Sequence, residues 1–202
     1  MNNKTIHWIA RAGFTGWLVF EFLNWIDVLH YTLDFTWFGL MFTLLFIWIG
    51  LEWISSALLK STGKSLPGMV FLLSLVGVSW DALGDIAHFY GRYEWYDQAA
   101  HTAGGASIGF VFFAIIWRLI ASGKLSMKIQ WHAFFAVSCG MLLGVLYELE
   151  EYIEDMFTGG NRLGSGVDTA NDLMCNLIGA VLIILIASWY VKRRNLRTQE
   201  IH

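Results

Sequence analysis

The sequence predicts an all-α fold, a polytopic membrane helix bundle with six transmembrane helices and both termini in the cytoplasm. Of its 202 residues, 56% are hydrophobic and only 14% are charged, whereas about a quarter of the residues of a soluble domain are charged. Five or six stretches approach the roughly 20 apolar residues that cross a bilayer. The connections are short and no internal repeat is visible, so we expect a single transmembrane domain over residues 1–202.

Local signals support each predicted helix in turn. The six helices are expected at residues 6–28, 36–59, 67–89, 97–121, 129–155 and 168–191. The third follows a polar loop and starts at Pro67, a residue suited to the first helical position because it has no backbone N–H to satisfy. Small residues four apart on the fourth and fifth helices, at 105 and 109 and at 140 and 144, predict close packing. The glycine-rich stretch 158–166 predicts a loop before the sixth helix.

Charged residues predict the orientation. If six helices cross, all but two of the 13 Lys and Arg residues fall on the side of the termini, the exceptions being Arg92 and Arg162. Cytoplasmic loops are enriched in Lys and Arg, so we expect both termini on the cytoplasmic side of an inner membrane. The basic tail at 192–197 fits a flank beside anionic lipid, and we expect no nucleic-acid partner.

Acidic, histidine and asparagine side chains gather at the predicted external ends of four helices. Residues three, four or seven apart share one face of a helix. Groups with this spacing occur on the predicted third, fourth, fifth and sixth helices, and they are, in that order, Asp81, Asp85 and His88; Asp97 and His101; Glu148 and Glu151; and Asp168, Asp172 and Asn176. We expect these groups to converge in one half-buried chamber open to the periplasm or exterior.

So many acids in a membrane need neutralisation, because one uncompensated carboxylate costs about 2.5–3.5 kcal/mol on insertion scales. Shared protons, a water-filled cavity or a bound divalent cation would each provide it. Mixed acid and histidine sets on facing helices are typical of metal sites in bundles. Donors dominated by oxygen favour Mg, Mn, Ca, Zn or Fe. We therefore predict a divalent metal ion held by the Asp, His and Asn residues named above, with Glu148, Glu151 and Arg162 as catalytic residues.

Part of this pattern resembles a known family. Asp97-x-x-x-His101, a later Glu at 148 or 151, Arg162, and Asp172 followed by Asn176 are similar to the VanZ-like membrane proteins. The Asp168/Asp172 pair and the Glu-x-x-Glu motif resemble the YjdF-type inner-membrane family, and the resemblance covers about residues 80–182. This chain has Gln98 where VanZ-like proteins usually have Lys, and it is more acidic, which favours a metal site over glycopeptide resistance.

Three kinds of function are compatible with such a site. A metal-dependent hydrolase or transferase would act on a membrane lipid or lipid-linked substrate, with Glu148 or Glu151 as general base and Arg162 holding a phosphate. A proton- or cation-coupled transporter is the first alternative, although Glu52 is the only acid expected in the inner half of the helices. A non-catalytic binding protein with a structural cation is the second. A haem between His88 and His101 is a further possibility, and the oligomeric state is left open.

Overall fold

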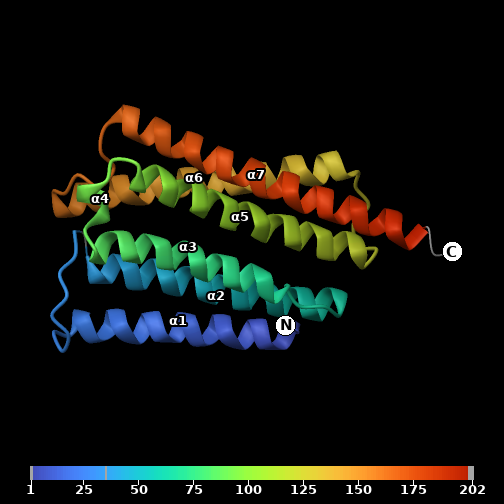
Figure 1. Ribbon diagram of the computed structural model, residues 1–202, viewed down its shortest axis with the longest axis horizontal. Helices are drawn as coiled ribbons and strands as arrows, with labels where there is room; N and C mark the ends of the chain where they lie inside the picture. The colour runs from blue at the N-terminus through green and yellow to red at the C-terminus, as the bar shows by residue number, and fades with distance from the viewer. Residues whose placement is uncertain (1, 35, 200–202) are drawn as a thin grey trace. The chain divides into compact units, whose positions relative to one another are not determined.

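The computed structural model describes residues 2–34 and 36–199, and this part of the chain is helical with connecting loops (Figure 1). The elements are α1 (Asn3–Trp25), α2 (Trp37–Thr62), α3 (Gly68–Ile86), α4 (Phe89–Arg92), α5 (Tyr96–Ala121), α6 (Ile129–Thr158) and α7 (Gly166–Gln199). The all-α prediction is confirmed, and six of these helices correspond to the six expected. The side chains of residues 194–199 lie outside the described part, so Arg194 and Arg197 of the basic tail are not placed.

Among the described residues, five helices are long and apolar enough to cross a membrane: α2, α3, α5, α6 and the part of α7 that ends at Arg193. The first helix, α1, does not meet this measure because it carries Arg11, Glu21 and Asn24 within its length. A multi-pass helical protein is therefore confirmed, whereas a count of six spans stays a prediction.

The chain divides into two compact units, Met1–Gly104 and Gly105–His202. The first contains α1 to α4 and the beginning of α5, and the second contains the rest of α5 with α6 and α7. The expectation of one domain over the whole chain stays a prediction.

In the first unit, α1, α2 and α3 pack against one another (Figure 1). Helices α1 and α3 run parallel and in register. Gly13 of α1 lies against Leu75 of α3. One turn further along, Trp17 Nε1–H donates to Ser79 Oγ at 2.7 Å. In both pairs the two residues are 62 positions apart in the sequence. A constant separation along two helices means that each residue of α1 lies level with the α3 residue 62 positions later.

Helices α1 and α2 are joined by an ion pair. Arg11 donates from Nε to one carboxylate oxygen of Glu52 at 2.6 Å and from a terminal nitrogen to the other at 2.8 Å. This two-bond geometry matches the planar donor fork of arginine. It explains how Glu52, the acid expected alone in the inner half, is accommodated.

In the second unit, glycines allow three helices to approach closely. A Cβ added at Gly105 of α5 would lie 2.2 Å from the backbone oxygen of Asn176 on α7. One added at Gly109 would lie 3.1 Å from Cα of Ala180, and one added at Gly140 of α6 would lie 3.4 Å from Cα of Gly109. The prediction that these small residues form packing faces is confirmed.

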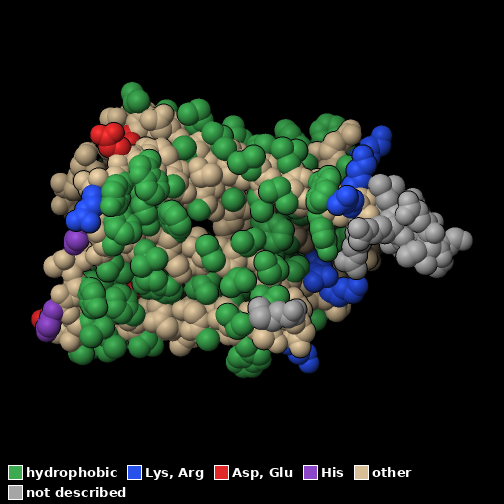
Figure 2. All heavy atoms as spheres, viewed as in Figure 1, with side chains coloured by type: hydrophobic (Ala, Val, Ile, Leu, Met, Phe, Trp, Pro, Cys, Tyr) green, Lys and Arg blue, Asp and Glu red, His purple; other side chains and the backbone are tan. Residues whose placement is uncertain are grey.

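The outer surfaces of the helices are apolar. Phe38, Phe46 and Trp53 of α2 are 64%, 66% and 73% exposed, and Figure 2 shows hydrophobic side chains along the visible face of the helices. Isolated exposed apolar residues are ordinary in soluble proteins, but extended apolar helix faces mark a surface that contacts lipid or another protein. These exposed apolar faces are suited to contact with the lipid chains of a bilayer.

The predicted third helix differs from the structure at its end. Helix α3 stops at Ile86, His88 adopts a left-handed conformation with φ 55°, and the four-residue helix α4 follows. The expectation that His88 continues the face of Asp81 and Asp85 is therefore wrong. At the other end of α3, Pro67 is the residue just before the helix rather than its first residue.

Candidate functional site

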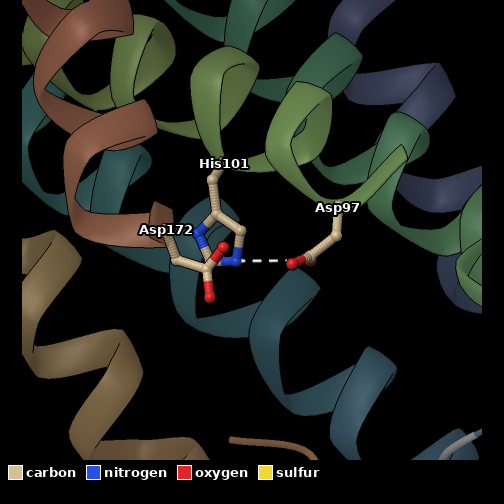
Figure 3. A group of neighbouring side chains, drawn as sticks. All are labelled: Asp97, His101 and Asp172. Carbon is tan, nitrogen blue, oxygen red and sulfur yellow. Dashed lines mark ion pairs between the residues drawn. The ribbon is translucent and has the colours of Figure 1, made fainter. Parts of the chain in front are cut away.

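Asp97 and His101 form an ion pair in the first two turns of α5. His101 Nε2 lies 3.4 Å from Asp97 Oδ1, as the dashed line in Figure 3 shows. Asp97 is in the first turn, where the positive end of the helix dipole favours an acid. His101 is buried. The predicted spacing thus produces a carboxylate and an imidazole side by side. Figure 3 also draws Asp172, which belongs to the second unit and is described there.

Asp81 and Asp85 of α3 are both positioned by hydrogen bonds. The Tyr90 hydroxyl donates to Asp81 Oδ1 at 2.6 Å, and the backbone N–H of Asp34 donates to Asp85 Oδ1 at 2.7 Å. Asp85 is buried, whereas Asp81 is partly exposed. Such bonds orient carboxylates in the way that outer partners orient metal ligands.

His88 contacts the segment between α1 and α2 through both ring nitrogens, and its role as a metal ligand stays a prediction. Its Nδ1 donates to the Asp34 carboxylate at 2.5 Å, and its Nε2 lies 3.0 Å from the Thr32 hydroxyl. Both ring nitrogens therefore attach the segment between α1 and α2 to the end of α3. A metal would have to displace one of these contacts, so the geometry favours a tethering role for His88 over ligation.

The second unit buries three acids and an amide on facing sides of α6 and α7. Asp172 is 3% exposed and Glu148 is 4% exposed, and Glu151 and Asn176 are also buried. A Cβ added at Gly144 would lie 3.2 Å from the side-chain nitrogen of Asn176, which places that amide against α6. The offsets of three and four residues therefore place these groups on buried helix faces rather than on the exposed apolar ones.

Asp168 lies nearer to the loop than the other acids of α7. Its backbone N–H donates to Ser165 Oγ at 3.2 Å, and a Cβ at Gly164 would lie 2.1 Å from its side-chain oxygen. Gly164 has φ 67° and leaves room for this carboxylate. Asp168 is only partly buried, at the N-terminal end of α7.

Arg162 is the centre of a polar cluster formed by the end of α6. Its Nε lies 3.1 Å from Glu151, and its terminal nitrogens lie 2.7 Å from Glu154 and 2.6 Å from the Tyr147 hydroxyl. Glu150 lies 3.8 Å away. The guanidinium is largely buried. The Arg162 guanidinium thus donates to protein groups, and its role in holding a phosphate stays a prediction.

Backbone hydrogen bonds close the same loop. Asp155 accepts from the N–H of Arg162 at 2.8 Å and from that of Leu163 at 2.9 Å. Helix α6 ends with Gly159 in a left-handed conformation, which turns the chain back towards Asp155. Glu154 and Asp155 are not among the site residues predicted from the sequence. The signal that could have revealed them is the helix-ending glycine between these acids and Arg162.

The second unit is rich in negative charge. Arg162 is the only Lys or Arg between Lys128 and Lys192, and the same stretch contains seven acids, Glu148, Glu150, Glu151, Glu154, Asp155, Asp168 and Asp172. One arginine cannot balance seven carboxylates. Proximity of acids from both units in one chamber stays a prediction.

The apolar helices, their hydrophobic exteriors and the buried acids near the helix ends define a multi-pass helical membrane protein. The chain belongs to the family described as "Predicted membrane protein (DUF2238)", which it matches over residues 12–193. No curated protein and no solved structure matches it. Membership of a membrane-protein family is thereby confirmed, while a specific VanZ-like or YjdF-type relationship is not shown.

Proposed function

We propose that this protein binds a divalent cation through the buried acids of its second unit, with Glu148, Glu151 and Asp172 as charged ligands and Asn176 as an amide ligand. The observation that carries the proposal is the burial of these four groups on facing helices of an apolar unit. Asp97 and His101 offer the same kinds of donor in the first unit.

The charge balance supports a cation. Burying a carboxylate is strongly unfavourable unless it is paired, and the stretch has one arginine for seven acids. Arg162 is already shared with Glu151 and Glu154. Carboxylate and amide oxygens suit Mg²⁺, Mn²⁺ or Ca²⁺, and an added imidazole would extend the choice to Zn²⁺ or Fe²⁺.

A metal-dependent hydrolase or transferase acting on a membrane lipid or lipid-linked substrate is the activity that this site would support. A bound divalent cation activates water or polarises a phosphoryl oxygen. Glu148 or Glu151 would then serve as general base. The surface of α6 next to these residues is apolar and exposed at Leu149, Tyr152 and Ile153, which suits a lipid. Because Arg162 is engaged by acids, substrate phosphate would be bound by the metal.

A structural cation is the second candidate, favoured by the close packing of Asn176 against Gly105 and Gly144. A proton- or cation-coupled transporter is less supported, because Glu52, the inner acid, forms an ion pair with Arg11.

We further propose an inner-membrane location with both termini in the cytoplasm and the site on the opposite side. The distribution of Lys and Arg along the chain supports this orientation. The VanZ-like and YjdF-type resemblance is retained as a distant relationship, supported by the Asp97/His101 and Asp172/Asn176 spacing.

Elemental analysis of the purified full chain tests the proposal. We expect a stoichiometric divalent metal that is lost in Asp172→Asn and Glu148→Gln. The metal should be retained in the matched control Asp27→Asn, whose side chain is 90% exposed. Metal content unchanged in both site variants, or no metal in the folded wild-type protein after dialysis against Mg²⁺, Mn²⁺, Ca²⁺, Zn²⁺ and Fe²⁺ in turn, would overturn it.

If the protein is an enzyme, the metal-loaded form should cleave a lipid or lipid-linked substrate and Glu148→Gln should abolish turnover. A bound metal with no turnover on phospholipid and lipid-linked diphosphate substrates would favour the structural cation.

A further inference from the structure

Glu21 of α1 and Asp85 of α3 are the two acids of the first unit that are almost fully buried. The side chain of Glu21 is 1% exposed, and within the described residues its Oε2 has no hydrogen-bond partner. The sequence-based site did not include Glu21. A carboxyl group in this position requires a ligand or a proton, because an unsatisfied buried acid is strongly unfavourable.

The register of α1 and α3 places Glu21 beside two further acids. The separation of 62 residues that holds at Trp17 and Ser79 puts Glu21 level with Leu83, between Asp81 and Asp85. The buried carboxyl group of Glu21 thus lies at the level of these two α3 acids within the first unit.

The group around Glu21 is ordered by hydrogen bonds. We call Glu21, Asn24, Asp81 and Asp85 the α1–α3 cluster. Asn24 is buried, donates to the Phe20 carbonyl at 2.8 Å and accepts from the backbone N–H of Tyr31 at 3.1 Å. Asp81 and Asp85 each accept one hydrogen bond, as described above. These contacts fix the side chains before any ligand arrives.

Two acids of this cluster, Glu21 and Asp81, take part in no ion pair in the described part of the chain, and Arg11 is engaged by Glu52. Two neighbouring carboxylates in a low-dielectric environment cannot both remain ionised without a positive partner. These two acids therefore require either a proton or a cation that the protein itself does not supply.

We propose that the α1–α3 cluster binds a hard divalent cation of the Mg²⁺ or Ca²⁺ class, with Glu21 and Asp81 as its charged ligands. Two carboxylates neutralise a divalent ion, and oxygen donors without thiolate or imidazole select hard cations. This site lies within the first unit and does not depend on the acids of α6 and α7. It would tie α1 to α3 at the end of the unit opposite Lys60 and Lys64.

Binding of Mn²⁺ to the purified full chain, measured by equilibrium dialysis, tests this site. Mn²⁺ accepts the same oxygen ligands and can be counted by its paramagnetic resonance signal. In Glu21→Gln and in Asp81→Asn we expect the loss of one Mn²⁺ per chain or an affinity weaker by about tenfold or more. Asp27→Asn should bind as the wild type does.

The result can be separated from that of the proposed function. Asp172→Asn should remove Mn²⁺ from the second unit only, and combining it with Glu21→Gln should add the two losses. Folded Glu21→Gln and Asp81→Asn that both bind the wild-type amount of Mn²⁺ with wild-type affinity would overturn the inference, whatever Asp172→Asn does.

A proton on Glu21 is the competing explanation, and chemical labelling distinguishes it. Dicyclohexylcarbodiimide reacts with protonated carboxyl groups in apolar surroundings, so bound metal should protect Glu21 from labelling. Mass spectrometry of the peptide that contains Glu21 should show strong labelling without metal and several-fold less at saturating Mn²⁺. Equal labelling under both conditions would refute cation binding. This measurement uses the wild-type chain and remains decisive if the variants fail to fold.

Discussion

Replacing Gly105 by alanine should separate helix α5 from α7 in the second unit. The added Cβ would lie 2.2 Å from the backbone oxygen of Asn176, 2.7 Å from its Cα and 2.8 Å from its carbonyl carbon. All three are backbone atoms, so no side chain can rotate away. One helix has to move by about 1 Å to restore ordinary contact distances near 3.5 Å. Gly104→Ala is the matched control, since nothing lies within 4 Å of its added Cβ.

The two substitutions should shift stability in opposite directions. Overpacking costs about 1–3 kcal/mol, and we take the upper end because the clash is with backbone. Alanine gains about 1 kcal/mol over glycine in a helix, which leaves Gly105→Ala destabilised by about 2 kcal/mol. For a chain of this size each kcal/mol corresponds to about 2–4 °C. We expect apparent melting temperatures about 4–8 °C lower for Gly105→Ala and about 2–4 °C higher for Gly104→Ala.

Thermal unfolding followed by tryptophan fluorescence in one detergent measures both variants. The chain has 11 Trp residues, which gives a strong signal. Asn176 would move with the displaced helix, so metal retention should fall in Gly105→Ala and stay unchanged in Gly104→Ala. Equal melting temperatures for the two variants would show that α5 and α7 do not approach as closely as described.

Other side-chain contacts give three further predictions. Arg162→Lys loses the planar donor fork, so limited proteolysis should cut the loop between α6 and α7 several-fold faster; a wild-type cleavage rate would argue against its role in closing this loop. Glu52→Gln weakens the ion pair with Arg11, and because this pair is about one-third exposed, the free energy of unfolding should fall by about 1 kcal/mol or less. An unchanged midpoint in chemical denaturation would argue against a stabilising role for the pair. Trp17→Phe removes the donor to Ser79 and should lower stability by about 1 kcal/mol, whereas Trp17→Phe in a Ser79→Ala background should show a much smaller further loss if the hydrogen bond is the cause.

Most helix positions could be predicted because hydrophobic stretches of membrane length leave few alternatives. The predicted end of the third helix was wrong, since nothing between Ile86 and Phe89 carries the glycine or proline that usually marks a helix end. There the chain turns at His88, whose side-chain contacts with Thr32 and Asp34 hold a left-handed backbone. Those contacts join residues more than 50 positions apart, which a local pattern does not contain.

Helical spacing placed Glu148 and Glu151 on one helix face and Asp172 and Asn176 on another, and all four residues are buried. Asp168, which the same spacing places on the face of Asp172, is only partly buried because it lies next to the loop. The partners of Arg162 could not be predicted in the same way. They depend on the chain reversing at Gly159, so that the loop returns over the last turns of α6. The place of Glu21 depended on the α1–α3 register, which only three-dimensional packing reveals.

Position 88 combines two demands that single replacements cannot meet together. Glycine would accept the left-handed backbone and lose both tethers, whereas glutamine would keep hydrogen-bonding capacity and resist the positive φ. Amino-acid replacements at position 88 should therefore be rare even if the side chain never binds a ligand. An invariant histidine here would be weak grounds for inferring chemistry, because the demands of the turn alone would be enough to preserve it.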